Sequence, residues 1–291
     1  MRIRTKEQNL MITKEKVLPF IRLALAEDVS EGDHSSLACI PKEKTGRAHL
    51  LIKDDGIIAG IQLAEWIFEI IDPNIKMQTL IKDGEHVKKG DIAFIVEGAS
   101  ISLLTAERLV LNCMQRMSAI ATKTNEYVKL VEGTKTTILD TRKTTPGIRI
   151  MEKWAVKIGG GSNHRFGLYD MIMLKDNHID FAGGITQAIE KVQKYLKDKN
   201  LNLRIEVEAR DMDEVKEIMS AGGIHRIMLD NFTPAETITA VEYINGAYET
   251  ESSGGITDKT IQSYAECGVD FISVGGLTHS IHNMDLSLKA F

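Results

Sequence analysis

Six short apolar runs in the second half of the chain constrain its fold more than any other feature, because each run ends in polar or glycine residues. The runs span residues 136–141, 171–174, 205–207, 227–229, 248–251 and 271–274. The residues that mark their ends, namely Arg142, Lys175, Glu208, Asp230, Ser253 and Gly275, are 33, 33, 22, 23 and 22 positions apart. Each interval has room for one strand and one helix, so the pattern predicts a parallel α/β domain.

The polar residues at these strand ends are expected to meet in space. In α/β barrels the side chains and loops at the carboxyl ends of the strands converge on one mouth, where the active site lies. Only six such strands are evident, two fewer than an eight-stranded barrel needs. A single acidic residue after a strand can simply cap the next helix. Six consecutive ends with basic, acidic and glycine residues favour a site.

The first half of the chain lacks this regular alternation of strands and helices, which predicts a separate domain. Helical periodicity covers residues 17–26, 61–71 and 103–131, and β-like runs lie within 46–59 and around 82–91. We place the boundary inside the long helix, which gives an N-terminal domain over 1–115 and a catalytic domain over 116–280. The final residues 281–291 predict an amphipathic helix that is a candidate to return to the first domain. The first ten residues are expected to be a frayed start.

Composition argues against several classes of protein. The chain has 36 Lys and Arg against 41 Asp and Glu, and this net charge of -5 disfavours a nucleic-acid surface, which carries a basic surplus. No apolar run approaches the roughly 20 residues of a membrane-spanning helix. Residues 1–10 lack the apolar segment of a signal peptide, and Cys39, Cys113 and Cys267 lack disulfide or zinc spacing. We therefore expect a cytoplasmic protein without nucleic-acid or membrane partners.

Charge is unevenly distributed along the chain. Between Asp140 and Asp176 there are seven Lys or Arg residues and four Asp or Glu residues, a balance of +3, so the rest of the chain sums to -8. Arginine binds carboxylates and phosphates through paired hydrogen bonds. The Arg142–Lys143 pair at a strand end and the glycine-rich segment 159–165 favour a pocket for a small, strongly anionic ligand over a solvated basic loop.

Two glycine turns follow the last two strands. Ser253-Gly254-Gly255 and Gly275-Gly276 each read as the opening of a helix, where backbone N–H groups can approach an anion closely. Two such turns are typical of the phosphate site of α/β barrels, although tight packing also uses glycine. Glu208 and Asp230 are candidates to hold Mg²⁺ or sugar hydroxyls, because magnesium is often bound by one or two carboxylates together with substrate phosphates.

Seven motifs, in order along the chain, resemble the quinolinate phosphoribosyltransferase family. They are D-T-R-K-T-T-P-G at 140–147, G-G-S-N-H-R at 160–165, M-L-K-D-N-H at 173–178, E-V-E at 206–208, L-D-N at 229–231, S-G-G at 253–255 and G-G-L-T-H-S at 275–280. The first of these is highly specific. The resemblance extends from about residue 27 to the last residue, and it departs from frequent family residues at His34–Ser35 and Gly276.

The resemblance implies an N-terminal open α/β sandwich domain and a C-terminal six-stranded incomplete α/β barrel, the type II phosphoribosyltransferase architecture. It implies a reaction of quinolinate with phosphoribosyl pyrophosphate that gives nicotinate mononucleotide, pyrophosphate and CO₂ for NAD biosynthesis, with Mg²⁺ as cofactor. It also implies a homodimer in which the N-terminal domain of one subunit covers the barrel mouth of the other. Larger assemblies, including hexamers, occur in the family.

The resemblance further implies roles for individual residues. The clamp on the two quinolinate carboxylates would consist of Arg142, His164, Arg165 and Arg108 of the partner subunit. Lys143 and Lys175 would lie near the pyridine ring and phosphoribosyl pyrophosphate, with Thr141 beside them, and Glu208 and Asp230 would lie at the ribose hydroxyls and Mg²⁺. The 5′-phosphate cradle would consist of Ser253, Gly254, Gly255, Gly275 and His279. The catalytic set would be Lys143, Lys175, Glu208 and Asp230.

Three other functions fit parts of the sequence. Lys175 at a strand end would suit a Schiff-base lyase or aldolase, which leaves the phosphate turns and the Arg/His set unexplained. A related phosphoribosyltransferase with a different acceptor, like the molybdenum-transport accessory proteins, would not need the complete Arg142, His164 and Arg165 set. Residues 82–97 resemble part of a lipoyl or biotinyl carrier with Lys76 before them, but the hairpin between is too short for a carrier.

Overall fold

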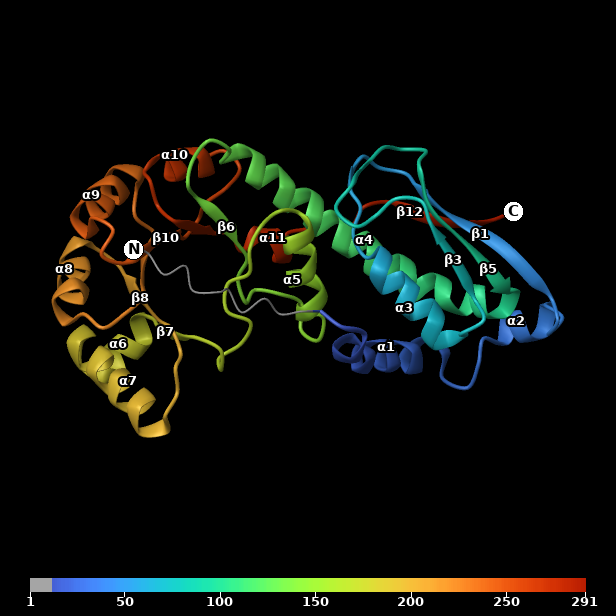
Figure 1. Cartoon of the computed structure of the whole chain (residues 1–291), viewed down its shortest axis with the longest axis horizontal. Helices are drawn as coiled ribbons and strands as arrows, with labels where there is room; N and C mark the ends of the chain where they lie inside the picture. The colour runs from blue at the N-terminus through green and yellow to red at the C-terminus, as the bar shows by residue number, and fades with distance from the viewer. Residues whose placement is uncertain (1–11) are drawn as a thin grey trace. The chain divides into compact units, whose positions relative to one another are not determined.

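A computed structural model describes residues 12–291, which form two compact units (Figure 1). Unit 1 contains the residues up to Ala121 together with Pro146–Ile158 and His282–Phe291, and unit 2 contains Thr122–Thr145 and Gly159–Ile281. The expectations of a frayed start and of no signal peptide fall on residues 1–11, which lie outside the described part of the chain.

Unit 1 is built on a four-stranded antiparallel sheet with the order β12–β1–β5–β3. The strands are β1 (Thr45–Ile52), β3 (Lys76–Thr79), β5 (Ile92–Ala99) and β12 (Leu286–Ala290), and β2 (Gly56–Ile57) pairs separately with β4 (His86–Val87). Along β1, the buried residues Ala48, Leu50 and Ile52 alternate with less buried ones, as the sequence pattern predicts. One face of the sheet is therefore apolar and requires a cover of helices.

The last element of unit 1 differs from the sequence-based expectation. The predicted helix over 281–291 is wrong, because Leu286–Ala290 forms strand β12, which pairs antiparallel with β1. Leu286 and Leu288 are buried while Ser287 between them is less so, which is the period of two of a strand. The apolar residues of a short segment can fit the period of a helix or that of a strand. Here the segment forms a strand because it pairs with the edge of β1.

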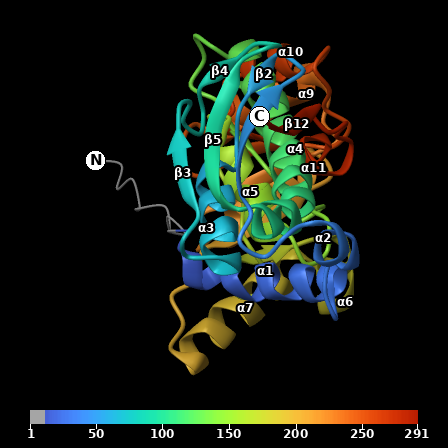
Figure 2. The same cartoon turned by 90° about the vertical axis from the view of Figure 1, so that its right-hand side faces the viewer.

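The helices of unit 1 cover its sheet. They are α1 (Lys14–Val29), α2 (His34–Cys39), α3 (Ile61–Ile71), the first part of α4 (Ser100–Leu130) and α5 (Arg149–Ile158). Figures 1 and 2 both show α3 and α4 on one side of the sheet. The Phe68 ring of α3 meets the Phe94 ring of β5 edge to face, with centroids 6.0 Å apart, so aromatic packing joins helix and sheet.

Helix α5 belongs to unit 1, although the predicted catalytic domain over 116–280 includes it. Glu152 is fully buried and forms an ion pair of 2.7 Å with Arg116 of α4. The Trp154 ring lies 5.7 Å from the Trp66 ring of α3. These contacts are made far from α5 in sequence, which explains why the order of elements along the chain does not reveal them.

Unit 2 contains a six-stranded parallel sheet with the order β6–β11–β10–β9–β8–β7. Its strands are β6 (Thr137–Leu139), β7 (Ile172–Leu174), β8 (Ile205–Ala209), β9 (Arg226–Asp230), β10 (Glu249–Ser253) and β11 (Phe271–Ser273). All six predicted strands are confirmed. Since β6 and β7 remain at the two edges, the sheet is an incomplete barrel.

Helices line the outer side of this sheet (Figure 1). They are α6 (Asp176–Ala182), α7 (Ile185–Lys199), α8 (Met212–Ala221), α9 (Pro234–Ile244), α10 (Ile261–Glu266) and the short α11 (Gly276–His279), which lies after β11. Val207, Ile227 and Leu229 are fully buried and belong to the same apolar core as Ile189 of α7 and Ile218 of α8. Among residues 12–291, no helix is both long and apolar enough to cross a membrane.

The strands of unit 2 present two different faces. Glu206 pairs with Arg226, which pairs in turn with Glu249, so these three side chains lie on the same face of the sheet. Val207 and Ile227, the next residues along the two strands, point to the helix-covered face. The inner face of the incomplete barrel is therefore charged, whereas the outer face supplies the apolar core.

The core of unit 1 provides a test of the fold. We expect Phe94→Ala to destabilise the protein by about 3–5 kcal/mol, because it leaves a cavity against Phe68. Ile92→Ala on the same strand should cost clearly less, since Ile92 is 37% exposed. Denaturant unfolding followed by circular dichroism measures both changes. Equal losses for the two variants would contradict the assigned faces of β5.

Candidate active site

The polar residues predicted from the strand ends lie along one edge of the parallel sheet. Ser253 at the end of β10 is in register with Asp230 at the end of β9, and Ser273 of β11 is in register with Leu139 of β6. Thirteen of the fourteen predicted site residues belong to unit 2, and Arg108 lies exposed on α4 in unit 1. The carboxyl ends of the six strands thus form the candidate active site.

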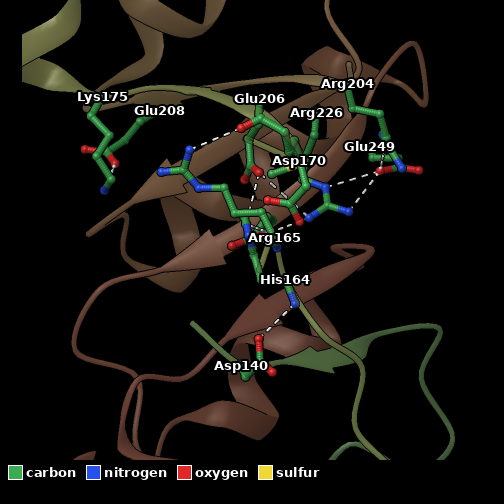
Figure 3. Close-up of polar contacts among 12 residues, drawn as sticks. Asp140, His164, Arg165, Asp170, Lys175, Arg204, Glu206, Glu208, Arg226 and Glu249 are labelled. Carbon is green, nitrogen blue, oxygen red and sulfur yellow. Dashed lines mark hydrogen bonds and ion pairs between the residues drawn. The ribbon is translucent and has the colours of Figure 1, made fainter. Parts of the chain in front are cut away.

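An acidic and basic cluster occupies the ends of β7, β8 and β9. The Lys175 Nζ atom lies 2.9 Å from Glu208 Oε2, and the Glu208 side chain is only 8% exposed (Figure 3). Burial and the nearby charge of Glu208 raise the pKa of Asp230 above its ordinary value. Two carboxylates of adjacent strands therefore face the same small volume, where a cation or sugar hydroxyls would relieve their repulsion.

A turn after β10 is held by the end of β9. The Asn231 N–H donates to the Ser253 carbonyl at 2.9 Å, and the Asn231 side chain donates to Asp230 Oδ2 at 2.7 Å. Gly254 has a φ of +96°, and a Cβ atom there would lie 2.2 Å from Asn231 Oδ1. Glycine is therefore required at 254. The expectation that this turn opens a helix is wrong, because α10 begins at Ile261.

The second glycine turn brings Lys143 and His279 together. A Cβ atom on Gly275 would lie 3.1 Å from both His279 Nε2 and Lys143 Cδ, so all three residues are in close contact. The Thr278 hydroxyl donates to the Lys143 carbonyl at 2.9 Å, and the Lys143 N–H donates to Thr141 Oγ1 at 3.0 Å. The loop after β6 is therefore fixed against α11, which places a lysine and a histidine beside the glycine turn.

Asp140 joins the two loops that carry the predicted anion clamp. Its fully buried carboxylate accepts hydrogen bonds from Asn163 Nδ2 at 2.6 Å and from the His164 N–H at 2.9 Å. Asp140 directly precedes Thr141 and Arg142, so one carboxylate orients the loop after β6 and the loop that contains Arg165. A buried carboxylate with two donors is a rigid anchor.

Arg142 and Arg165 lie near each other in this clamp. Burial and the charge of Arg142 lower the pKa of the Arg165 guanidinium. Arg165 Nη1 donates to the Met171 carbonyl at 3.2 Å, which holds the side chain in place. Two neighbouring guanidinium groups that repel one another are suited to a ligand with two negative charges, which would remove the repulsion.

The His164 ring points at two glutamates of the barrel interior. Its ring is buried, with Nε2 3.0 Å from Glu206 Oε2 and 3.5 Å from Glu251 Oε2 (Figure 3). The Arg165 N–H donates to Nδ1 at 2.7 Å. Both ring nitrogens therefore face protein atoms. These contacts indicate that His164 supports the neighbouring arginines from the barrel interior, and its implied contact with a ligand carboxylate stays a prediction.

Glu206, Arg226 and Glu251 are buried charged residues that the sequence interpretation leaves out of the site. Arg226 Nη1 lies 2.7 Å from Glu251 Oε2 and 3.9 Å from Glu206 Oε2. The signal was present in the sequence, because Glu at 206, 208, 249 and 251 alternates with small or apolar residues inside strands. Parallel strands covered by helices are normally apolar, so such charges indicate a polar barrel interior.

The charges in this buried group balance. Burial lowers the pKa of His164, but the charges of Glu251 and Glu206 outweigh it and raise the pKa to about 10. Burial likewise opposes ionisation of Glu251, but His164 and Arg226 lower its pKa to about 2. Burial and the charge of Glu251 also raise the pKa of Glu206. The Arg165 N–H can donate to Nδ1 only while that nitrogen carries no proton, so His164 and Glu206 share one proton between them. This shared proton and Arg226 together compensate the two carboxylates.

Two groups of residues offer ligands for a metal ion. The ligand atoms of His164, Glu206 and Glu251 all lie within 4.8 Å of one another. Arg226 already supplies a cation to that group, and both nitrogens of the His164 ring already face protein atoms. Glu208 and Asp230 are the better candidates, because they lie at the strand ends and offer the carboxylate oxygens that Mg²⁺ prefers.

The raised pKa of His164 predicts a pH-dependent stability. Because the folded-state pKa lies above the ordinary value, the contribution of the proton that His164 and Glu206 share is complete below about pH 6.5 and is lost as the pH rises through about 10. The melting temperature of wild type and of His164→Gln should therefore be compared across this range. We expect the advantage of wild type to shrink towards alkaline pH. A difference that stays constant would mean that the ring is neutral throughout.

Comparisons with known proteins cover both parts of the chain. Residues 33–118 match the family described as quinolinate phosphoribosyl transferase, N-terminal domain, and residues 120–289 match the C-terminal domain of the same description. The chain is 49% identical over 284 residues to the chloroplastic, carboxylating nicotinate-nucleotide pyrophosphorylase of Arabidopsis thaliana, covering 92% of this chain and 81% of the relative.

Two bacterial proteins show the same similarity. The probable carboxylating nicotinate-nucleotide pyrophosphorylase of Bacillus subtilis is 39% identical over 262 residues, which cover 90% of this chain and 89% of the relative. The crystal structure of NadC from Streptococcus pyogenes superimposes with a TM-score of 0.90 at 36% identity, covering 96% of this chain and 97% of that one. Sequence and fold therefore agree over nearly the whole chain.

Proposed function

The chain belongs to the quinolinate phosphoribosyltransferase family, and we infer that it transfers a phosphoribosyl group from phosphoribosyl pyrophosphate to quinolinate with loss of CO₂. The products are nicotinate mononucleotide, pyrophosphate and CO₂, and the reaction serves NAD biosynthesis. The observation that best supports this function is the pair of neighbouring guanidinium groups, Arg142 and Arg165, on the same sheet edge as the Lys175–Glu208–Asp230 cluster. A dicarboxylate and a phosphorylated sugar require such neighbouring sites.

We propose that Arg142 and Arg165 bind the two carboxylates of quinolinate and orient its ring nitrogen towards the ribose. Bidentate contacts to both carboxylates would leave the pyridine little freedom to rotate. Such orientation converts the meeting of two substrates into an intramolecular step, which is a large part of catalysis in group transfer. Lys143, fixed between Gly275 and His279, would lie near both substrates.

In the first step, the bond between the ring nitrogen and ribose C1 forms while the bond from C1 to the pyrophosphate oxygen breaks. Positive charge develops on the sugar and negative charge on the leaving group. We propose that the carboxylates of Glu208 and Asp230 accept hydrogen bonds from the ribose hydroxyls and stabilise the positive charge on the sugar. Lys143 and Lys175 would stabilise the negative charge on the pyrophosphate. The turns at 253–255 and 275 would hold the 5′-phosphate through their backbone N–H groups.

Mg²⁺ is a proposed cofactor of this site. Glu208 and Asp230 fit it. Glu208 is nearly buried, and burial together with the charge of Glu208 raises the pKa of Asp230, so a cation between the two carboxylates would be favourable. Magnesium bound to pyrophosphate would neutralise charge on the leaving group. The carboxylates would hold the ion together with substrate oxygens, as magnesium sites commonly do.

In the second step, the bond from ring carbon 2 to its carboxylate breaks, CO₂ leaves, and the electron pair stays on carbon 2 until a proton from solvent is added. The ring nitrogen became positively charged in the first step and stabilises this electron pair. We therefore propose that coupling precedes decarboxylation. Holding the carboxylate with fixed arginines orients the breaking bond, while the proton is the only further reactant needed.

We also propose that the active site is shared within a homodimer. Arg108 is exposed on α4 in unit 1, far in sequence from the other cationic residues, and within residues 12–291 it makes no ion pair. An exposed arginine of a dimer can complete the anion clamp of a second copy. Larger assemblies such as hexamers are compatible with this arrangement.

Two alternative functions lose support. Lys175 is engaged in an ion pair with Glu208, whereas a Schiff-base lysine needs a free amine. Lys76 pairs with Glu97 inside the sheet of unit 1, whereas a carrier lysine lies at the exposed tip of a hairpin. We further propose a cytoplasmic location, since Cys39, Cys113 and Cys267 are all free thiols, as a reducing compartment favours.

The reaction itself is the central test. Purified protein with quinolinate, phosphoribosyl pyrophosphate and Mg²⁺ should form nicotinate mononucleotide and CO₂, and nicotinate should not replace quinolinate. Lys143→Ala should lower kcat by about 10²-fold or more, because it removes a cation from the developing charge. Lys259→Ala, an exposed lysine of unit 2, serves as the matched control and should stay near wild type. Absence of product from quinolinate would refute the function.

Subunit mixing tests the shared site. Arg108→Ala and Lys143→Ala should each be inactive, but equal mixtures should recover about a quarter of the wild-type rate, because half the dimers are mixed and each has one intact site. A mixture of Lys143→Ala and Glu208→Gln should recover no activity. Both changes lie on unit 2, so each site of a mixed dimer contains one of them. Mixed dimers that form, as shown by native mass spectrometry, yet remain inactive would exclude sharing through Arg108.

A further inference from the structure

Four side chains of unit 2, His164, Glu206, Arg226 and Glu251, form a group that we call the buried charge cluster. Glu206, Arg226 and Glu251 come from the adjacent strands β8, β9 and β10, and each of the four side chains is at most 9% exposed. Figure 3 shows His164 with Glu206 and Arg226, apart from the Lys175–Glu208 pair. Glu206 lies two residues before Glu208 on the same strand face, one step deeper in the barrel.

The buried charge cluster is held from two further directions through Arg226. Its guanidinium lies over the Phe271 ring, 3.9 Å from the centroid, and its Nε donates to Glu249 Oε2 at 3.2 Å. Arg226 and one proton shared by His164 and Glu206 compensate the two carboxylates. Because the charges balance only as a set, removal of one member leaves a buried charge without compensation.

The cluster is connected to the anion clamp through His164. The ring receives a hydrogen bond from the Arg165 N–H, and the His164 N–H donates to Asp140. Asp140 precedes Arg142 by two residues. The orientation of the imidazole therefore determines the backbone direction at Arg165 directly, and that of the Arg142 loop through Asp140.

We propose that Glu251, together with Glu206 and Arg226, is a positioning residue of the dicarboxylate site. Its carboxylate fixes the His164 ring from below, and the ring in turn orients the guanidinium groups of Arg165 and Arg142. This inference rests on the proposed function, because it assigns the arginines to the two carboxylates of quinolinate. It assigns no contact with substrate to any member of the cluster.

Glu251 and Glu249 offer a matched pair for the test. Both lie on the inner face of β10 and both accept from Arg226. Glu249 is partly exposed, pairs also with Arg204, and makes no contact with His164. A change at Glu249 therefore removes one carboxylate from Arg226 but leaves the support of His164 intact.

Steady-state kinetics with both substrates provides the main readout. Glu251→Gln keeps the shape and hydrogen-bonding capacity of the side chain but removes its charge. We expect the KM for quinolinate to rise about tenfold to a hundredfold, as small misplacements of binding groups can do. The KM for phosphoribosyl pyrophosphate should change by less than about twofold, and Glu249→Gln should leave both KM values within about twofold of wild type.

A second measurement needs no variant. In wild-type protein labelled with ¹⁵N-histidine, quinolinate alone should shift the His164 ring signals, because it contacts the arginine that is bonded to that ring. Phosphoribosyl pyrophosphate alone should leave the signals in place. His225, whose Nδ1 accepts from the Ile205 N–H, serves as an internal reference that neither ligand should move.

Each outcome decides between support and rejection. A normal KM for quinolinate in Glu251→Gln, or an equal rise in both KM values, would overturn the positioning role. If Glu251→Gln does not fold, the ¹⁵N measurement decides, and His164 signals that ignore quinolinate would overturn the proposal. An inactive wild-type protein would instead refute the proposed function, which keeps the two failures distinct.

Discussion

The pairing of parallel strands in unit 2 is the constraint on which the rest of that unit depends. Register places Glu206, Arg226 and Glu249 in one row and Val207, Ile227 and Thr250 in the next. One row faces the interior of the incomplete barrel, and the other packs beneath the helices. A slip by a single residue would exchange the two rows, burying charges among apolar helices and exposing the core.

This constraint separates two uses of charge. Lys175, Glu208 and Asp230 lie at the strand ends, where a ligand can reach them. A bound ligand can relieve the repulsion between the two carboxylates or replace the ion pair of Lys175 with Glu208. One step deeper, Arg226 and Glu251 form an ion pair of 2.7 Å and are almost fully buried. Charges in the first group act on substrates, whereas charges in the second group determine geometry. The same strand contributes to both groups because its inner side chains repeat every second residue.

Much of unit 2 could be predicted from the sequence, because its information is local. Each strand is a short apolar run, and each site residue at a strand end follows directly from it, as Lys175 and Asp230 illustrate. The resemblance to a known family supplied the identities that spacing could not. The cluster around Glu251 was missed because a charged residue inside a strand can be read as exposed until its neighbours in the sheet are known. The inward direction of His164 depends on the same neighbours.

Unit 1 departs from its sequence pattern for a similar reason. Residues 281–291 read as a helix because their apolar residues support more than one period, and only the edge of β1 selects a strand. Helix α5 lies between two segments of unit 2 in sequence, and the match to the C-terminal domain family includes it, although its contacts group it with unit 1. Its contacts with Arg116 and Trp66 are long-range, and no local pattern records them. When the chain passes between two domains several times, the domain boundaries are therefore hard to locate from the sequence alone.

The pairing of β12 with β1 has a consequence for biosynthesis. Residues 286–290 leave the ribosome after all of unit 2, yet they form the outer strand of the sheet in unit 1. Until then, β1 has β5 as its sole partner in that sheet, and its other edge presents unpaired N–H and C=O groups. The sheet whose strand β1 is made before any strand of unit 2 is thus completed only after all of them. The nascent chain therefore has an unpaired strand edge, which is prone to aggregation, throughout synthesis of the barrel.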